Sequence, residues 1–286
     1  MKEKAYAKIN LHLAVKEKRA DGYHNIESVM FSVSLCDEIT VLVCEKKKTG
    51  GSQLEIEAYG RFGSVIQDLP LEKNLVYKAF ILFFENVSYN VYMKIRLNKR
   101  IPAGAGLAGG SSDAAAMLRL LNRIFHCYSF KKLMMMGSKI GADVPFCLQK
   151  KPAFCIGIGN IISVYNKLRL KIWVVITFND CHISTKEAYQ NLLSCNSNTE
   201  DCKKIKELIY LSEFRYYFNS FENYAIKLFS EIANIKKFMY DYGAFFSLMT
   251  GSGSSVVGYF KSKQTACKAA GFMNEKGFDS VVSYLI

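Results

Sequence analysis

The chain contains 286 residues, of which half are hydrophobic and 22% are charged. This much apolar mass is enough for a large buried core, so it excludes a disordered or low-complexity protein, and the length predicts about two domains. Lysine and arginine outnumber aspartate and glutamate by 38 to 25, and the net charge of +13 favours an anionic partner, either nucleic acid or a phosphorylated small molecule.

The sequence shows neither a membrane span nor a secretory signal. Charged residues interrupt every apolar run before it reaches the roughly 18 residues that a membrane helix needs. The first residues, MKEKAYAKINLHLAVKEKR, lack the apolar core and the small-residue cleavage site of a signal peptide. We therefore expect a cytoplasmic protein without a membrane partner.

The nine cysteines and four histidines show no spacing typical of a metal site or a disulfide framework. The cysteine count is odd, no pair has C-x-x-C spacing, and no H-E-x-x-H motif is present. We therefore expect reduced thiols and no metal ion held by protein side chains alone. The basic residues form short scattered clusters instead of one arm or stripe, but net charge alone does not decide between the anionic partners.

The first hundred residues favour β structure. Residues 5–15 alternate between apolar and polar side chains, and Asp21-Gly22 marks a turn. A charged, glycine-containing segment at 46–52 predicts a hairpin loop, and residues 74–86 have the apolar spacing of an amphipathic helix. The further strands are expected at 26–35, 38–43, 53–59 and 91–97.

The remaining elements alternate between helices and strands, with a change of character near residues 151–165. The expected helices cover 114–125, with a Ser or Asp N-cap, and 130–140, which ends at Gly141. Further helices are expected at 185–193, 207–218, 223–240 and 264–275, and strands at 171–178, 245–249 and 280–286. The segment at 256–260, after the turn that follows 245–249, is expected to be either a strand or a helix. We place the domain boundary at residue 155, with one domain over 1–155 and the other over 156–286.

A glycine-rich loop joins the strand at 91–97 to the helix at 114–125. Its small residues leave successive backbone N–H groups free to converge on a phosphate, and the helix that follows adds the positive end of its dipole. A flexible linker is the alternative, but linkers rarely lead directly into so regular an amphipathic helix. The residues of this predicted phosphate loop are Pro102, Ala103, Gly104, Ala105, Gly106, Leu107, Ala108, Gly109, Gly110, Ser111 and Ser112.

This loop does not match the better-known nucleotide-binding motifs. It contains G-x-G-x-x-G, but the acidic residue expected about 20 positions later is missing. No lysine follows the last glycine, as a Walker loop requires, and the H-R-D, D-F-G and A-P-E signatures of protein kinases are absent. The sequence therefore predicts a phosphate loop of another type.

Two other segments have more than one interpretation. Asp143, in G-A-D-V-P, precedes a proline suited to a first helical turn, so it could equally be an ordinary N-cap or a functional carboxylate. The glycine- and serine-rich run at 250–255 is, from its spacing, more typical of a hairpin turn than of a ligand-binding loop.

Taken together, these segments resemble the GHMP kinases. The loop P-A-G-A-G-L-A-G-G-S-S resembles the phosphate loop of that family, and residues 250–255 resemble its C-terminal Gly-Ser-Gly turn. The segments A-K-I-N-L from Ala7, A-D-G-Y-H from Ala20 and G-A-D-V-P from Gly141 resemble one branch of the family, whose members phosphorylate a cytidine-diphosphate-linked sugar alcohol. The resemblance covers essentially the whole chain.

The resemblance implies an α+β, two-domain GHMP kinase fold. The N-terminal domain would be rich in β structure and carry the phosphate loop and helices, and the C-terminal domain would be an α/β sandwich. It also implies that ATP, with Mg²⁺, phosphorylates the 2-hydroxyl of cytidine-diphosphate-linked methylerythritol in non-mevalonate isoprenoid biosynthesis. The partner would be this small molecule and not nucleic acid, and the chain would act as a monomer or homodimer.

The resemblance also implies a role for each of several residues. Asp143 would be the catalytic base and Lys8 its partner, since a carboxylate can accept the proton of the alcohol while an ammonium keeps that carboxylate ionised. The phosphate loop would hold ATP, with Ser111 or Ser112 near Mg²⁺. The residues implied in substrate binding are Asn10, Tyr23, His24, Thr185 and Tyr189. Without the resemblance, the sequence would indicate that Lys8 is a solvated strand residue and that the tyrosines are ordinary core or rim aromatics.

Some positions depart from the family pattern. Ala105 and Ala108 replace common glycines, which requires negative φ angles, and Asp113 replaces a usual asparagine at the helix start. Lys186 stands where proline is frequent, and residues 219–225 only loosely match the Asn-Asp-Leu-Glu segment of the family. Two other functions stay open: a GHMP kinase for another alcohol, such as homoserine or mevalonate, and a nucleic-acid-binding module without enzymatic activity.

Overall fold

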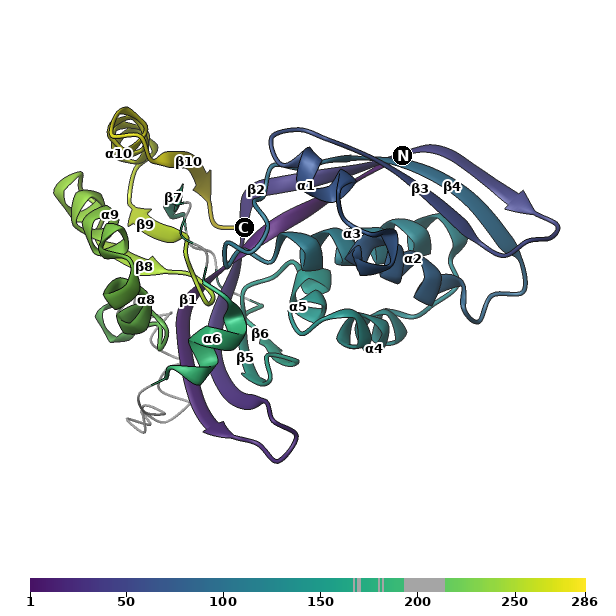
Figure 1. Ribbon diagram of the computed structural model, residues 1–286, viewed down its shortest axis with the longest axis horizontal. Helices are drawn as coiled ribbons and strands as arrows, with labels where there is room; N and C mark the ends of the chain where they lie inside the picture. The colour runs from purple at the N-terminus through teal and green to yellow at the C-terminus, as the bar shows by residue number, and fades with distance from the viewer. Residues whose placement is uncertain (167, 169–170, 180, 182, 193–213) are drawn as a thin grey trace. The chain divides into compact units, whose positions relative to one another are not determined.

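A computed structural model describes residues 1–166, 168, 171–179, 181, 183–192 and 214–286. They form two compact units that are discontinuous in the sequence. Unit 1 contains Met1–Ala7, Leu35–Ala103 and Ala108–Lys150, and unit 2 contains Lys8–Ser34, Gly104–Leu107 and Lys151–Ile286. Figure 1 follows the elements along the chain. A domain boundary at residue 155 stays a prediction.

Two long strands near the N-terminus, β1 (Lys2–Lys18) and β2 (His24–Lys47), contribute residues to both units. In unit 1, β2 pairs antiparallel with β4 (Asn90–Asn98), which pairs in parallel with β3 (Gln53–Tyr59). The hairpin predicted at 46–52 is therefore wrong, because β4 lies between β2 and β3. The strands predicted at 26–35 and 38–43 are one continuous strand with an irregularity between Val41 and Val43.

The helices of unit 1 follow the apolar spacing of the sequence. Side chains of Asn74 and Ser129 cap α2 and α4 by accepting hydrogen bonds from Val76 and Lys132 backbone N–H groups, and Gly141 ends α4 as predicted. The elements are α1 (Gly63–Gln67), the 3₁₀ turn η1 (Leu71–Lys73), α2 (Leu75–Phe84), α3 (Gly109–Phe125), α4 (Phe130–Ile140) and α5 (Val144–Gln149).

The start of α3 differs from the prediction. The helix begins at Gly109, and its N-cap is Ala108 in the left-handed conformation, with a φ of 54°, so the predicted Ser or Asp N-cap is wrong. The expectation that Ala108 has a negative φ is also wrong. The apolar pattern hid this start because the first helical residues are glycines and serines, which carry no hydrophobic period.

Unit 2 contains two sets of paired strands. The first half of β2 pairs with β5 (Ala153–Gly157), which pairs with β6 (Ile161–Val164). A separate antiparallel sheet has the order β10-β7-β9-β8 (Figure 1). Its strands are β7 (Trp173–Phe178), β8 (Phe246–Met249), β9 (Val256–Phe260) and β10 (Asp279–Tyr284).

The helices of unit 2 include α9 and α10, which contact the strands of this second sheet. The helix predicted at 223–240 is interrupted at Phe229, whose backbone is extended. The helix predicted at 207–218 falls largely outside the described residues, and 214–216 form a 3₁₀ turn. The elements are α6 (Thr185–Gln190), η2 (Phe214–Tyr216), α8 (Glu222–Leu228), α9 (Ser230–Asp241) and α10 (Lys263–Glu275).

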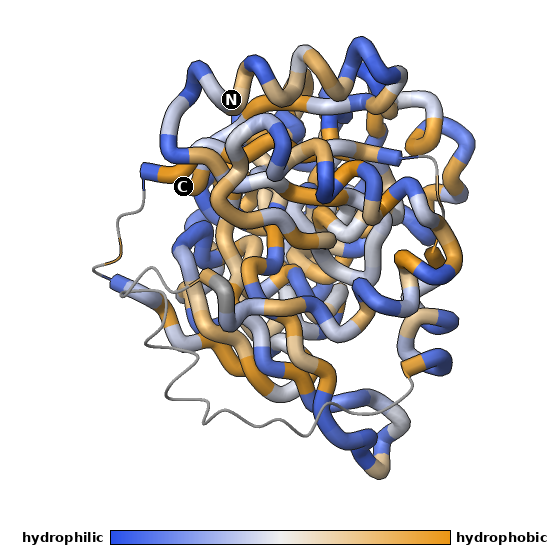
Figure 2. Tube along the Cα trace, turned by 90° about the vertical axis from the view of Figure 1, so that its left-hand side faces the viewer, coloured by the Kyte–Doolittle hydropathy of each residue, from blue (hydrophilic) through white to orange (hydrophobic). Residues whose placement is uncertain are grey.

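Buried apolar side chains from strands and helices form the core of each unit. In unit 1, α3 contributes a nearly continuous buried face from Ala114 to Leu118, and in unit 2 all five residues of β9 are buried. Figure 2 shows hydrophilic residues concentrated at the outer turns of the chain. Among the described helices, none combines the length and the hydrophobicity that crossing a membrane would require.

Candidate active site

In unit 1, the predicted phosphate loop leads into the N-terminus of α3. Gly109, Gly110, Ser111 and Ser112 form the first turn of this helix. The backbone N–H of Ser112 donates to the carbonyl of Ala108 at 2.8 Å, so the N–H groups of Gly109, Gly110 and Ser111 are the ones that the helix itself does not pair, at its positive end. Ser112 is buried, and its hydroxyl donates to the carbonyl of Gly109 at 2.8 Å. The arrangement has the donor groups that a phosphate needs.

Asp143 lies in the same unit, directly before α5. It occupies the N-cap position, but its side chain makes no capping hydrogen bond to the helix. A Cβ atom placed on Gly141 would lie 3.7 Å from the Ser111 hydroxyl, so the segment that carries Asp143 passes beside the first turn of α3. Unit 1 therefore brings the G-A-D segment, in which the Asp143 side chain is partly exposed, beside one of the two serines predicted near Mg²⁺.

In unit 2, Lys8 is a buried residue of β1 and not the solvated strand residue that its spacing alone suggested. Its ammonium group donates to Asn10 Oδ1 at 2.7 Å, and its backbone N–H donates to the carbonyl of Leu107 at 3.1 Å. Hydrogen bonds therefore hold both parts of Lys8. Asn10, two residues along β1, holds its side chain, and the phosphate loop holds its backbone.

Asn10 connects Lys8 to the glycine- and serine-rich turn between β8 and β9. Its Oδ1 also accepts from the backbone N–H of Gly251 at 3.0 Å, and its own backbone N–H donates to Thr250 Oγ1 at 2.9 Å. Its Nδ2 donates to Ser28 Oγ at 2.8 Å. Asn10 is 1% exposed, so these bonds are protected from water.

The phosphate loop meets the same turn within unit 2. Gly106 has a φ of +76°, and a Cβ atom there would lie 2.1 Å from the carbonyl oxygen of Thr250. Conversely, a Cβ atom on Gly251 would lie 2.7 Å from the Cα atom of Gly106. The two loops therefore touch through backbone atoms alone, which only glycine permits.

The turn at 250–255 does join antiparallel strands, as its spacing predicted. Two residues that the sequence only loosely indicated also form hydrogen bonds with this turn and with the end of β8. Asn219 donates from Nδ2 to the carbonyls of Met249 and Gly251, both at 2.8 Å, and Glu222 Oε1 accepts from the Met249 backbone N–H. Both residues lie in the segment that only loosely matched the family pattern.

The residues predicted to bind the substrate lie on two parts of unit 2. His24 and Tyr189 stack with ring centroids 5.1 Å apart, and Tyr23 is 62% exposed. The Thr185 and Ser252 hydroxyls share a hydrogen bond at 3.0 Å, which links α6 to the turn between β8 and β9. Unit 2 therefore brings His24 together with Tyr189, and Thr185 together with the turn.

Asp113 neither caps α3 nor lies free near the loop. It is buried in unit 1 and forms an ion pair with Lys99, which also pairs with Asp37. Burial raises the pKa of Asp113 above its ordinary value, and the opposing effect of Lys99 is smaller. Burial alone would lower the pKa of Lys99, but the two carboxylates outweigh it and raise that pKa. No motif in the sequence indicates this cluster.

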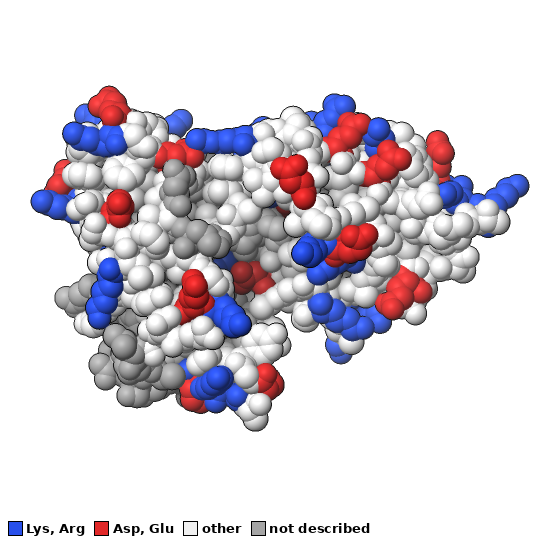
Figure 3. Space-filling view, in the orientation of Figure 1, with Lys and Arg blue, Asp and Glu red and all other residues white. Residues whose placement is uncertain are grey.

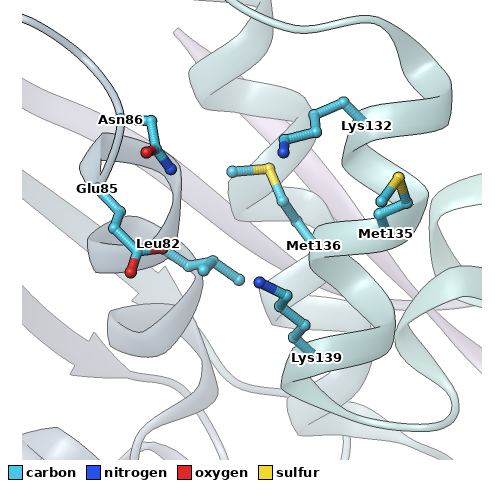
Figure 4. Close-up of a pocket in the computed structure, with 7 residues that line it drawn as sticks. All are labelled: Leu82, Glu85, Asn86, Lys132, Met135, Met136 and Lys139. Atoms are coloured by element: carbon cyan, nitrogen blue, oxygen red, sulfur yellow. The ribbon is translucent and has the colours of Figure 1, made fainter.

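A small cavity in unit 1 lies apart from these residues. It has a volume of about 50 Å³ and lies between α2 and α4 (Figure 4). Sites for small molecules typically measure about 300–1,000 Å³, so this cavity is too small for a nucleotide. Its lining residues are Leu82, Glu85, Asn86, Lys132, Met135, Met136 and Lys139.

The surface charges are mixed. On the face shown in Figure 3, lysine and arginine side chains are interspersed with aspartate and glutamate and form no continuous basic stripe. Within the described residues, no group of three or more His, Cys, Asp or Glu side chains could hold a metal ion.

Comparison with known proteins identifies the family. The GHMP kinases N terminal domain matches residues 74–151, and the GHMP kinases C terminal domain matches residues 192–279. A relative from Clostridium perfringens (strain 13 / Type A), named 4-diphosphocytidyl-2-C-methyl-D-erythritol kinase, is 37% identical over 96% of this chain and 94% of its own. A relative of the same name from Bacteroides fragilis (strain YCH46) is 38% identical over 92% of this chain and 93% of its own.

Several solved structures are also similar to this chain. The crystal structure of a 4-(cytidine 5'-diphospho)-2C-methyl-D-erythritol kinase has a TM-score of 0.81 and 31% identity, covering 100% of this chain and 99% of that one. A homoserine kinase from Cytophaga hutchinsonii has a TM-score of 0.71 at 17% identity, covering 100% of this chain and 94% of that one, so it shares the fold alone. These matches confirm the predicted two-domain α+β kinase fold and a phosphotransferase that uses ATP. This chain belongs to the 4-diphosphocytidyl-2-C-methyl-D-erythritol kinases, within the GHMP kinase family.

Proposed function

We propose that this chain transfers the terminal phosphoryl group of ATP to the 2-hydroxyl of 4-diphosphocytidyl-2-C-methyl-D-erythritol. The observation that carries the proposal is the similarity to kinases named for this substrate, which extends over 96% of the chain at 37% identity. The hydrogen-bonded arrangement of Lys8, Asn10 and the two glycine-rich loops supports it, because a kinase needs such a fixed frame for phosphate groups.

In this proposal Asp143 accepts the proton of the attacking hydroxyl. Its side chain is partly exposed and is not used as a cap of α5. Lys8, oriented by Asn10 at 2.7 Å, would supply the positive charge that the resemblance to the family assigns to it and offset charge on the transferring group. The backbone N–H groups at the start of α3 hold the phosphates.

The donor set fits a Mg²⁺ ion that is held mainly by ATP. The described residues offer no carboxylate cluster, and Mg²⁺ commonly keeps its waters and binds phosphate oxygens with few protein ligands. Ser112 is buried whereas Ser111 is partly exposed, so we assign the metal-side hydroxyl to Ser111, beside Gly141. When bound, Mg²⁺ would neutralise charge on the phosphate oxygens.

The substrate's cytidine end would be recognised by aromatic residues of unit 2. Tyr189 already stacks on His24 at 5.1 Å, and the exposed Tyr23 belongs to the same turn segment as His24. We propose that His24 binds the base edge while the tyrosine rings contact the flat face of the cytosine. Replacing both Tyr23 and His24 by Ala should raise the KM for the cytidyl substrate and leave the KM for ATP nearly unchanged.

The test of the overall function is ADP release in Mg²⁺-ATP with four acceptor conditions: the cytidyl substrate, homoserine, mevalonate and no acceptor. Turnover only with the cytidyl substrate would support the proposal. Turnover with another alcohol would keep the kinase chemistry and contradict the roles of Tyr23, His24 and Tyr189. Absence of turnover with every acceptor, together with salt-sensitive binding of nucleic acid, would contradict the enzymatic reading.

The catalytic base has its own test. The substitution Asp143→Asn removes the proton acceptor and keeps the shape of the side chain, so we expect turnover to fall by about 10²- to 10⁴-fold. ATP should still bind, because the phosphate-binding groups are unchanged, and calorimetry with a non-hydrolysable ATP analogue measures this directly. Turnover close to that of the unmodified enzyme would rule out Asp143 as the base.

A further inference from the structure

Three charged residues of unit 1 are buried next to the phosphate loop. Lys99 directly follows β4, Asp37 belongs to β2, and Asp113 belongs to α3. Their side chains are 4%, 0% and 2% exposed, respectively. The Lys99 ammonium pairs with both carboxylates, and its distance to Asp113 Oδ2 is 2.7 Å. We call these three residues the Lys99 cluster.

The cluster fixes the start of the phosphate loop. Asp37 Oδ1 accepts hydrogen bonds from the backbone N–H groups of Arg100 and Ile101, the latter at 2.9 Å. These are the last two residues before Pro102. One carboxylate oxygen therefore holds the entering chain on β2, while its second oxygen holds the Lys99 ammonium.

The cluster also fixes the end of the loop. Asp113 lies four residues after Gly109, the first residue of α3, so its bond to Lys99 joins the residue before the loop to the helix after it. The Lys99 ammonium lies 3.4 Å from the position that a Cβ atom would take on Gly109. Closing the segment in this way removes much of the conformational freedom of the loop backbone.

Stability alone does not account for this cluster. It buries two carboxylates against one ammonium, and Asp113 Oδ1 has no hydrogen-bond partner. Buried ion pairs of this kind are often no more stabilising than apolar side chains of similar volume, and burying a second carboxyl group beside one ammonium adds a further cost. What the cluster does supply is a fixed distance and orientation between β2, the loop entrance and α3.

We propose that Lys99, Asp37 and Asp113 are positioning residues for phosphoryl transfer, which hold both ends of the phosphate loop in the shape that binds ATP. This inference rests on the proposed function for the identity of the nucleotide. None of the three side chains needs to touch ATP, because they act through the backbone N–H groups of the loop and of the first turn of α3.

The central experiment measures binding of a non-hydrolysable ATP analogue by calorimetry, without acceptor. Lys99→Met keeps the length of the side chain and removes both ion pairs, and we expect the Kd for the analogue to rise at least tenfold. In turnover assays the KM for ATP should rise similarly, while the KM for the cytidyl substrate should change less than twofold. An unchanged Kd, or an equal rise in both KM values, would overturn the proposal.

Lys94→Met is the matched control. Lys94 lies on the same strand, β4, but its ion pair with Glu57 at 2.7 Å is at the surface. We expect the Kd for the analogue to stay within twofold. A loss equal to that of Lys99→Met would show that any lysine of this strand has the same effect, which would overturn the specific role of the cluster.

A neutral triple variant separates positioning from folding. Lys99→Met leaves two unmatched carboxylates and could fail to fold, whereas Lys99→Met with Asp37→Asn and Asp113→Asn buries no charge at all. We expect this variant to unfold at a higher temperature than Lys99→Met and still to bind the analogue at least tenfold more weakly. Recovery of full affinity together with stability would show a merely structural role.

The analogue-binding assay also separates this proposal from the proposed function. If the unmodified enzyme does not turn over the cytidyl substrate but binds the ATP analogue, the proposed substrate is wrong while the Lys99 cluster is still tested by the Kd values. If the unmodified enzyme turns over the substrate and Lys99→Met binds the analogue normally, the proposed function holds and the positioning proposal fails.

Discussion

Asn10 illustrates how one residue can orient a site without offering free groups to a ligand. The resemblance to the family implies that Asn10 binds substrate, but its side chain already bonds to Lys8, Gly251 and Ser28. Because it is 1% exposed, a substrate contact would have to replace one of these bonds. The hydrogen bonds favour a role in positioning Lys8 against the turn between β8 and β9.

This role predicts the kinetics of Asn10→Ala. The substitution removes the Asn10 acceptor that orients the Lys8 ammonium and leaves the Gly251 N–H without its acceptor, so we expect kcat to fall at least tenfold and the KM for the cytidyl substrate to change less than threefold. Steady-state kinetics with the substrate varied at saturating ATP measures both. A large rise in KM at constant kcat would instead show that Asn10 contacts the substrate.

Ser28→Ala is the control for Asn10. It removes the partner of Asn10 Nδ2 and the donor to the His12 carbonyl, and it leaves the bonds of Asn10 to Lys8 and Gly251 in place. We expect a loss of stability of about 1–3 kcal/mol, from the unsatisfied buried amide, and a decrease in kcat well below that of Asn10→Ala. Equal losses of kcat in the two variants would mean that general destabilisation explains both.

At the scale of elements, the contact between the phosphate loop and the β8–β9 turn depends on glycine. Gly106→Ala would place a Cβ atom 2.1 Å from the Thr250 carbonyl oxygen, at a φ of +76°. We expect the variant to lose at least about 2 kcal/mol of stability, because both strain and overlap oppose the native loop contact. Thermal or urea unfolding of the purified variant measures the loss.

Gly271 in α10 provides the opposite case. A Cβ atom there meets nothing within 4 Å, and the residue lies inside a helix. Gly271→Ala should therefore stabilise the protein by about 0.5–1 kcal/mol, because alanine has the higher helix propensity. A neutral Gly106→Ala would contradict the close approach of the two loops, and a destabilising Gly271→Ala would contradict the open space beside Gly271.

The elements also show what the sequence could and could not predict. Period-two and helical patterns located β1, β3, β4, α2, α4 and α10 correctly, because apolar side chains recur along each of them with the period of a strand or a helix. The pairing of β3 with β4 was missed, since alternation identifies a strand but not its neighbour. The start of α3 was missed because glycine and serine carry no hydrophobic period.

The residues of the candidate site also divide into those that the sequence indicates and those that it does not. The phosphate loop, Lys8 and Asp143 were predicted from short local motifs that resemble those of the family. Asn219, Thr250 and the Lys99 cluster act through hydrogen bonds between segments far apart in the chain, which no local pattern encodes. Asp113 was noticed only as a departure from the family pattern, and its partners Lys99 and Asp37 gave no signal of their own.

At the scale of the whole molecule, the two units differ in how their buried ionisable groups respond to acid. In unit 2, burial lowers the pKa of His12 to about 3, assisted by the nearby positive charge of Lys16. The imidazole packs against Tyr217 and Phe218 and accepts from the Phe218 backbone N–H. In unit 1, burial opposes ionisation of Glu3, but hydrogen bonds from Lys150 and Arg119 outweigh it and lower its pKa.

These pKa shifts predict that lowering the pH destabilises unit 2 before it destabilises unit 1. The unfolded state binds a proton on His12 below about pH 6.5, whereas the folded state does so only near pH 3, so the free energy of unfolding falls between these values by up to about 1.4 kcal/mol per pH unit. The contribution of Glu3 is present above its ordinary pKa of 4.5 and is lost only as the pH falls below that value.

A titration can follow each unit separately. Trp173, the single tryptophan, lies in β7 of unit 2, so its fluorescence reports unit 2, and hydrogen exchange of the α3 amides reports unit 1. We expect the fluorescence change at a higher pH than the loss of α3 protection. His12→Asn keeps an acceptor for the Phe218 N–H and does not titrate, so it should move the fluorescence transition to lower pH and leave α3 unaffected. Coincident transitions, or a fluorescence transition that His12→Asn does not move, would show that His12 does not set the acid limit of unit 2.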